Sequence, residues 1–147
     1  MNYRNADSKD LDTLAKLFED YRSFYRKETD LVGAKSFLTE RISNKDSEIF
    51  VAENTESQLT GFVQLHPLFS SVRMKKLWLL NDLFVHAEYR KQKIGIGLIN
   101  KAKELVEKSN ACGMYLETEK TNLIGNKLYP KMGFKLKQDE NFYEWNF

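Results

Sequence analysis

The sequence contains a single cysteine, Cys112, and only two prolines among its 147 residues. One cysteine cannot form an internal disulfide, and one cysteine with two histidines cannot supply a structural zinc site of the usual kind, so no metal is expected. Such sparse cysteine usage favours a reducing, cytoplasmic location. No stretch approaches the roughly 18 consecutive apolar residues of a membrane helix, which argues against a membrane partner.

Neither sign of charge is in clear excess. Lys and Arg number 23 and Asp and Glu number 21, which gives a formal net charge of +2. Nucleic-acid-binding domains usually carry a basic excess on one face, so we expect no nucleic-acid partner. A composition of 41% hydrophobic and 13% aromatic residues excludes intrinsic disorder. The length predicts one domain over residues 1–147.

Hydrophobic spacing predicts helices and strands in alternation. Helices are expected over residues 11–25, 31–43, 95–109 and 122–132, and strands over 2–6, 48–53, 59–65, 76–86, 114–118, 134–136 and 142–147. The strand–helix–strand unit across residues 77–118 implies a right-handed crossover and a locally parallel strand pair. This order predicts an α/β (α+β) fold with a mixed sheet and flanking helices.

The segment Gln92-Lys93-Ile94-Gly95-Ile96-Gly97 follows an expected strand and begins an expected helix. Glycines let the backbone approach an anion closely, and a helix N-terminus carries about half a positive charge. The segment is therefore typical of a pyrophosphate-binding loop, and a glycine-containing loop beside solvated lysines is the alternative. A dinucleotide fingerprint would need glycine or alanine in place of Asn100, and a P-loop would need Gly-Lys-Ser/Thr.

Residues 121–134 form the second informative segment, with Tyr129 on a short expected helix. A tyrosine hydroxyl has an ordinary pKa of about 10, close to that of an alkyl thiol, so Tyr129 could donate a proton to a leaving thiolate. The alternative for Tyr129 is a half-buried packing role.

Together the two segments resemble the GCN5-related N-acetyltransferase (GNAT) superfamily. Its cofactor motif Gln/Arg-x-x-Gly-x-Gly/Ala is matched by Gln92, Gly95 and Gly97. Its later motif Asn-x-x-(Ala/Gly)-x-x-x-Tyr-x-x-x-Gly-Phe is matched by Asn122, Gly125, Tyr129, Gly133 and Phe134. Residues 80–90 further resemble small polyamine and amino-acid acetyltransferases. The resemblance implies a mostly antiparallel twisted sheet of six to seven strands, about four helices and a splayed parallel strand pair.

The resemblance also implies that acetyl-CoA lies between the splayed strands. The backbone of Phe84 and Val85 would pair with the pantetheine, and the N–H groups of residues 93–97 would hold the pyrophosphate. Asn122 would contact the cofactor, and Tyr129 would protonate the departing thiolate. Many relatives begin the pyrophosphate motif with an arginine. In this sequence Arg90 lies two residues before Gln92, so either residue could make that contact.

Asp82 is the expected general base for the amine, because it interrupts an apolar strand close to the expected thioester. Glu117 on the neighbouring strand and a water molecule are the other candidates, and a strand-bulge role bonded to backbone amides is the alternative for Asp82. Asn81 would orient the water or the substrate. Aromatic and acidic residues of the first two helices and their connection, such as Tyr25 and Glu28, would favour a cationic ligand. The aromatic residues could equally belong to the core.

The sequence therefore predicts an acetyl-CoA-dependent N-acetyltransferase acting on a primary amine of a small molecule, such as a polyamine or an amino acid. A protein N-terminus or lysine is the alternative acceptor. A non-catalytic acyl-CoA-binding module is the alternative function, against which the presence of both Asp82 and Tyr129 argues. The apolar strand expected over residues 142–147 would present an edge for a second copy, which predicts a homodimer.

Overall fold

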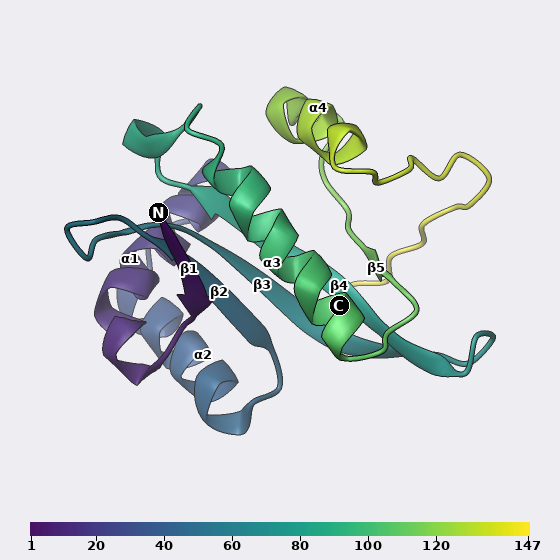
Figure 1. Ribbon diagram of the computed structural model, residues 1–147, viewed down its shortest axis with the longest axis horizontal. Coiled ribbons are helices and arrows are strands. Elements are labelled where there is room, and N and C mark those ends of the chain that lie inside the picture. Colours follow the sequence, from purple (N-terminus) through teal and green to yellow (C-terminus); the bar gives the residue numbers. More distant parts are fainter. The chain divides into compact units, whose positions relative to one another are not determined.

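The computed structural model describes residues 1–147, which form two units, Met1–Glu117 and Thr118–Phe147 (Figure 1). The first unit contains β1 Asn2–Asn5, the 3-10 helix η1 Ser8–Asp10, α1 Leu11–Phe24, α2 Leu31–Asn44, β2 Glu48–Glu53, β3 Leu59–Ser70, β4 Lys75–Val85, the 3-10 helix η2 Ala87–Tyr89, α3 Ile94–Lys108 and β5 Met114–Tyr115. The second unit contains α4 Leu123–Lys131.

The strands form one sheet in the order β1-β2-β3-β4-β5. All neighbours are antiparallel except β4 and β5, which are parallel. The α+β class, the mixed sheet and the parallel pair are confirmed. The sheet has five strands rather than the expected six to seven.

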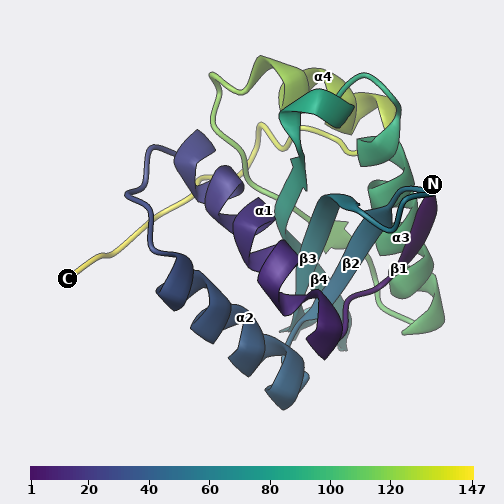
Figure 2. The same cartoon turned by 90° about the vertical axis from the view of Figure 1, so that its left-hand side faces the viewer.

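Helices cover both faces of the sheet in the first unit. Figure 2 shows α1 and α2 on one side of the strands and α3 on the other. Apolar residues of α1 and α2 face the sheet and form a core with Val51, Phe62 and Phe84. Leu98, Ile99 and Ala102 of α3 are buried as well. The apolar stripes that predict these helices are thus the faces they bury.

The strand expected over residues 114–118 contains only Met114 and Tyr115, because β4 pairs with it at no more than two positions. No strand forms over residues 134–136 or 142–147. An apolar run becomes a strand only where a neighbour satisfies its backbone groups, and these residues have no such neighbour. Phe142, Tyr143 and Trp145 are instead exposed. The structure therefore shows no strand edge there for a second copy to pair with.

Arg4 of β1 joins η1 and β2. Its guanidinium donates to the two carboxylate oxygens of Asp10 at 2.7 and 2.8 Å and to Glu53 Oε1 at 2.9 Å. The hydrogen bond from Arg4 lowers the pKa of Asp10, and the same partner lowers the pKa of Glu53. The network holds β1 against β2 and against η1, the 3-10 helix that leads directly into α1.

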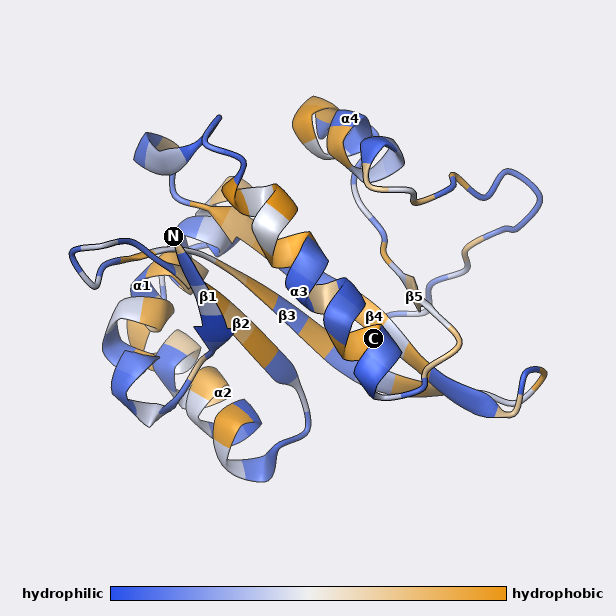
Figure 3. Ribbon diagram, in the orientation of Figure 1, coloured by the Kyte–Doolittle hydropathy of each residue, from blue (hydrophilic) through white to orange (hydrophobic).

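Hydropathy follows the layers of the first unit. In Figure 3 the middle of β2 is hydrophobic, whereas α1 and α3 alternate between hydrophilic and hydrophobic residues, as expected for helices with one buried face. None of the helices is both long enough and apolar enough to span a bilayer.

Candidate functional site

The parallel strand pair separates after two residue pairs. Trp78 pairs with Met114 and Leu79 with Tyr115, and the pairing then ends. Strand β4 continues to Val85, so residues 80–85 have no strand partner on that side. This is the splayed arrangement that the resemblance implied for the strands.

The ladder between β3 and β4 determines which backbone groups face the open edge. The N–H of His86 donates to the carbonyl oxygen of Thr60 at 2.9 Å. Backbone groups alternate along an antiparallel strand, so those of Phe84 also face β3 and those of Leu83 and Val85 face away from it. The open edge therefore offers Leu83 and Val85, whereas the sequence analysis expected Phe84 and Val85.

Arg90 is held at the end of β4. Its Nε donates to the carbonyl oxygen of Val85 at 3.2 Å, and its guanidinium lies 5.8 Å from the centre of the Phe84 ring. Gln92 is exposed in the following loop. Of the two residues considered for the pyrophosphate contact, Arg90 is thus the one that packs against the strand.

A β-bulge at Asn81 reorients the end of β4. Leu80 pairs with Leu65 and Asp82 with Gln64, which leaves Asn81 as the extra residue. Because side chains alternate between the faces of a sheet, one inserted residue moves every later side chain to the opposite face. Asp82 consequently shares the face of α1 and α2 with Gln64, instead of the face covered by α3.

Asp82 is 4% exposed, and both of its carboxylate oxygens accept hydrogen bonds. Gln64 Nε2 donates to Oδ2 at 2.6 Å and Asn81 Nδ2 donates to Oδ1 at 3.1 Å. The bulged residue is therefore Asn81, and the donors to Asp82 are side-chain amides rather than the backbone amides of the alternative interpretation. Glu117, the second candidate base, is exposed beyond the end of β5.

The C-terminal half of α1 approaches the bulge. The hydroxyl of Tyr21 donates to the carbonyl oxygen of Asn81 at 3.5 Å, and its ring meets that of Phe84 edge-on. Tyr25 in turn meets Tyr21 edge-on with ring centres 5.2 Å apart. Tyr21 thus packs against the core and touches the bulge, while Tyr25 and the exposed Glu28 follow it.

A buried carboxylate holds the connection between α1 and α2. Glu19 accepts a hydrogen bond from Arg22 and another from the backbone N–H of Asp30. Asp30 caps α2 by accepting from the N–H of Gly33. The loop that carries Glu28 is therefore anchored at its far end. Glu19 is a site residue that the motifs do not reveal, although an acidic residue on the apolar side of a helix is a signal that could have found it.

The N-terminus of α3 has no side-chain cap. Lys91 and Lys93 both adopt a left-handed backbone conformation, each with φ of 63°. Alternation of left- and right-handed residues turns successive N–H groups toward a common point and forms an anion-binding nest. The first N–H groups of a helix also lack intrahelical acceptors. The segment predicted to bind pyrophosphate thus has the backbone form of an anion site.

Gly97 has a second role that the motif did not reveal. A Cβ at residue 97 would overlap the ring and hydroxyl of Tyr3 on β1. The burial of Tyr3 raises the pKa of its hydroxyl. The second glycine of the cofactor motif therefore makes room for Tyr3 against α3.

In the second unit, Asn122 is the N-cap of α4. Its Oδ1 accepts from the N–H of Gly125 at 3.1 Å, and its Nδ2 donates to Thr118 Oγ1 at 2.9 Å. A Cβ on Gly125 would crowd the side chains of Asn122 and Tyr129. Tyr129 meets Phe134 edge-on with ring centres 5.8 Å apart. An asparagine before a helix is an ordinary capping signal, and it could have predicted this role for Asn122.

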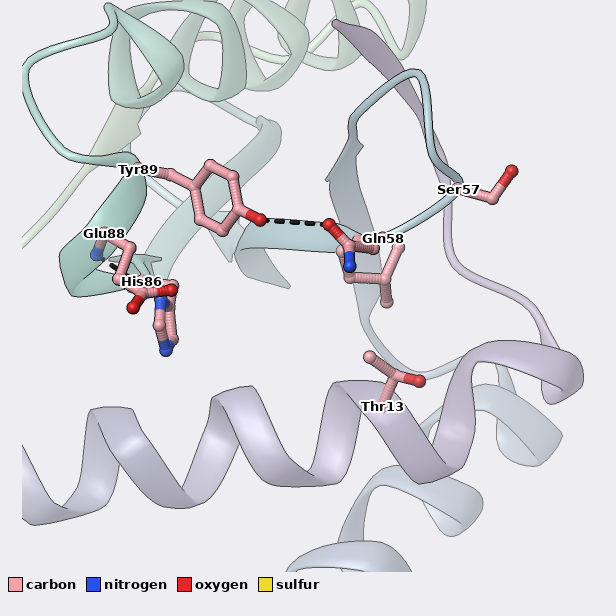
Figure 4. Close-up of a pocket in the computed structure, with 7 residues that line it drawn as sticks. Thr13, Ser57, Gln58, His86, Glu88 and Tyr89 are labelled. Carbon is pink, nitrogen blue, oxygen red and sulfur yellow. Dashed lines mark hydrogen bonds between the residues drawn. The ribbon is translucent and has the colours of Figure 1, made fainter.

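A pocket of about 370 Å³ lies at the end of β4. The hydroxyl of Tyr89 donates to Gln58 Oε1 at 3.0 Å beside it (Figure 4). The lining residues are Thr13, Ser57, Gln58, Leu59, His86, Glu88 and Tyr89. None of the residues predicted to bind or react lines this pocket. No group of three or more His, Cys, Asp or Glu side chains is arranged to hold a metal ion.

Comparison with known proteins identifies related chains over nearly the whole length. A model of the acetyltransferase (GNAT) family matches residues 12–134. The uncharacterized N-acetyltransferase YhfO of Bacillus subtilis is 39% identical over 145 residues, which cover 99% of this chain and 95% of that protein. A probable acetyltransferase of Haemophilus influenzae is 30% identical over 146 residues, 98% of this chain and 97% of that one. The crystal structure of a probable acetyltransferase matches with a TM-score of 0.94 and 34% identity, covering 100% of this chain and 98% of that one.

Proposed function

The chain belongs to the acetyltransferase (GNAT) family and is an N-acetyltransferase, and on that premise we propose that it moves the acetyl group of acetyl-CoA to a primary amine of a small molecule. The observation that carries the proposal is the unpaired edge of β4, which is followed along the chain by the uncapped N-terminus of α3. A polyamine or an amino acid is the acceptor class we favour.

These two features fit the two parts of the proposed cofactor. An extended chain of amides can add to an open strand edge through backbone hydrogen bonds, and Leu83 and Val85 face that edge. A diphosphate suits a nest at a helix N-terminus, here residues 93–97, with Gln92 just before it. When bound, acetyl-CoA would supply an acetyl thioester.

Asp82 is the proposed base. An ammonium group has no lone pair, so an amine must lose a proton before it attacks. Asp82 adjoins the open edge of β4 and is buried, with one donor on each oxygen. Each carboxylate oxygen can accept a further hydrogen bond, which leaves room for the proton of the amine or of a bridging water. Asn81, whose side chain is exposed at the bulge, is the proposed partner of the acceptor.

Tyr129 is proposed as the proton donor to the leaving thiolate on the strength of the family motif alone. Its ring packs on Phe134, and Gly125 leaves space beside it. The capping role of Asn122 uses one lone pair of its side-chain oxygen and one amide hydrogen, so the second lone pair and the second amide hydrogen remain for a contact with the cofactor.

Tyr25 and the exposed Glu28 support a cationic acceptor. Aromatic faces and carboxylates both attract an ammonium group. The ring of Tyr25 packs on that of Tyr21, and Glu28 lies in the loop that Glu19 anchors at Asp30. A small amine needs no more than such a local site.

The test is the release of free CoA thiol from acetyl-CoA in the presence of a panel of amines. The panel contains a polyamine, an amino acid, an aminoglycoside and a lysine-containing peptide, with a reaction lacking amine as the control for hydrolysis. We expect release above the control with a small amine and little with the peptide. Preference for the peptide would favour a protein acceptor. If the protein binds acetyl-CoA but releases no CoA thiol with any amine, it is a non-catalytic acyl-CoA-binding module.

A further inference from the structure

Three polar side chains, the partly buried Ser47 and the buried Gln64 and Asp82, form a continuous chain of hydrogen bonds. The hydroxyl of Ser47 donates to Gln64 Oε1 at 3.0 Å, and Gln64 Nε2 donates to Asp82 Oδ2 at 2.6 Å. Gln64 is completely buried at 0% exposure on β3, within the face that packs against α1 and α2. An amide at such a position is costly unless each of its polar atoms has a partner.

The chain has only one workable direction. A carboxylate accepts hydrogen bonds and cannot donate them, so the amide NH₂ of Gln64 must face Asp82. The amide oxygen then faces Ser47, whose hydroxyl donates to it. A reversed amide would place two oxygens 2.6 Å apart, whereas the hydroxyl of Ser47 could accept as well as donate. Asp82 therefore fixes the orientation of the Gln64 amide, and Ser47 satisfies the amide oxygen that this orientation turns away from Asp82.

Asp82 relies on these neutral donors because it forms no ion pair. Asn81 supplies the second amide, on Oδ1. The neighbouring titratable groups are Tyr21 of α1, which donates to the Asn81 carbonyl oxygen, and His66, two residues along β3 on the face of Gln64. No lysine or arginine pairs with Asp82. The hydrogen bonds that orient its carboxylate therefore come from the amides of Gln64 and Asn81.

We propose that Gln64 is a positioning residue for acetyl transfer and that Ser47 supports it by donating to its amide oxygen. The inference rests on the proposed function, in which Asp82 is the base. Gln64 holds the Asp82 carboxylate in one rotamer, so that its remaining lone pairs face the acceptor. The Asn81 bulge is part of the same device, since it turns Asp82 onto the face where Gln64 lies.

The first measurement requires no substrate. The side-chain carboxyl carbon of Asp82 is followed by NMR in protein labelled with ¹³C at aspartate, and Asp82→Asn identifies its signal. A hydrogen bond to a charged group contributes about 1.5–3 kcal/mol, which corresponds to an upward shift of the titration midpoint of about one to two pH units in Gln64→Leu. Ser47→Ala should give a smaller upward shift, and Ser47→Thr, which keeps the hydroxyl, should stay near wild type. Gln58→Leu, at an exposed glutamine, is the matched control.

The second measurement links the chain of hydrogen bonds to catalysis with the best amine. In Gln64→Leu and Ser47→Ala we expect kcat to fall, by about tenfold or more in Gln64→Leu, while the KM for acetyl-CoA stays within about twofold. The acid limb of the kcat profile should move by the same interval as the NMR midpoint. Ser47→Ala removes a single oxygen from a partly buried side chain, so it remains informative if Gln64→Leu does not fold.

The outcomes separate the two proposals. An unchanged Asp82 midpoint in Ser47→Ala and Gln64→Leu would overturn the positioning role, as would a normal kcat in both variants. Absence of turnover in the wild-type protein with every amine would instead refute the proposed function, while the NMR titration would still report whether Gln64 and Ser47 control Asp82.

Discussion

The ring of Tyr3 occupies the space that a Cβ on residue 97 would need. Tyr3 lies on β1 opposite Ala52, and Gly97 lies in the first turn of α3. The contact joins the edge strand of the sheet to the helix whose N-terminus forms the candidate anion site. A glycine that would be assigned to the cofactor from its motif is thus also a packing position.

The first prediction concerns this contact. Gly97→Ala should lower the free energy of unfolding by about 1–3 kcal/mol, because an added methyl group in a filled site forces the ring or the helix to move. The loss should disappear in the Tyr3→Ala background, since the two positions share one space. Urea unfolding of the two single variants and the double variant measures the coupling. Additive losses would contradict the contact.

The second prediction tests the anion site at Gly95. Gly95→Asp should leave the fold intact, because a carboxylate near a helix N-terminus is stabilising by about 0.3–1 kcal/mol. It should nevertheless weaken acetyl-CoA binding at least tenfold, since like charges brought together cost several kcal/mol. Calorimetric titration measures the affinity, and Gly95→Asn separates the effect of charge from that of size. If folded Gly95→Asp binds acetyl-CoA as tightly as wild type, residues 93–97 do not form the pyrophosphate site.

The third prediction uses the lowered pKa of Asp10. Arg4 lowers it by hydrogen bonding, so the folded protein binds this proton less readily than the unfolded chain does. The pair therefore stabilises the fold above the ordinary carboxyl pKa of about 4, and this contribution fades as the pH falls below that value. Arg4→Met should cost about 1.5 kcal/mol at pH 7 and markedly less at about pH 3. Urea unfolding at both pH values checks it, with Lys16→Met at an exposed position of α1 as the control. An equal cost at both pH values would show that Arg4 acts through packing.

The helices and most of the sheet follow from periodicity because their apolar faces are the ones they bury. The helix predicted over residues 31–43 is observed at Leu31–Asn44, and the strand predicted over 48–53 is β2. The residues predicted over 114–118 and 142–147 carry similar apolar content but lack a ladder partner for most of their length. Pairing is a property of two segments, and a local pattern describes only one.

The same limit applies to the candidate site. Asp82 and the loop before α3 are visible in the sequence, because polar residues interrupt an apolar strand and glycines open a helix. The roles of Gln64 and Ser47 cannot be read from the sequence. A glutamine in a strand does not indicate that a bulge in the next strand will bring Asp82 beside it. Leu83 replaces Phe84 at the open edge for a related reason, since the ladder decides which backbone groups face outward.

The fourth prediction concerns Tyr129. Tyr129→Phe keeps the ring that packs on Phe134 and removes only the hydroxyl. Binding of acetyl-CoA and the thermal midpoint should change little, whereas kcat should fall about 10²-fold or more if the hydroxyl protonates the thiolate. Steady-state kinetics and a thermal melt measure both quantities. Near-normal turnover with a lower melting temperature would assign Tyr129 to packing and the proton to water.

The central claim is that Asp82 removes the proton of an acceptor amine at the open edge of β4. The most direct measurement is the pH dependence of turnover for wild type and Asp82→Asn with the best amine of the panel. Loss of a general base costs about 10²–10⁴-fold, so we expect a deficit of that size near pH 7 that shrinks as the pH rises and free amine becomes abundant. A small deficit of equal size at every pH would contradict the claim and leave Asp82 as a structural residue of the bulge.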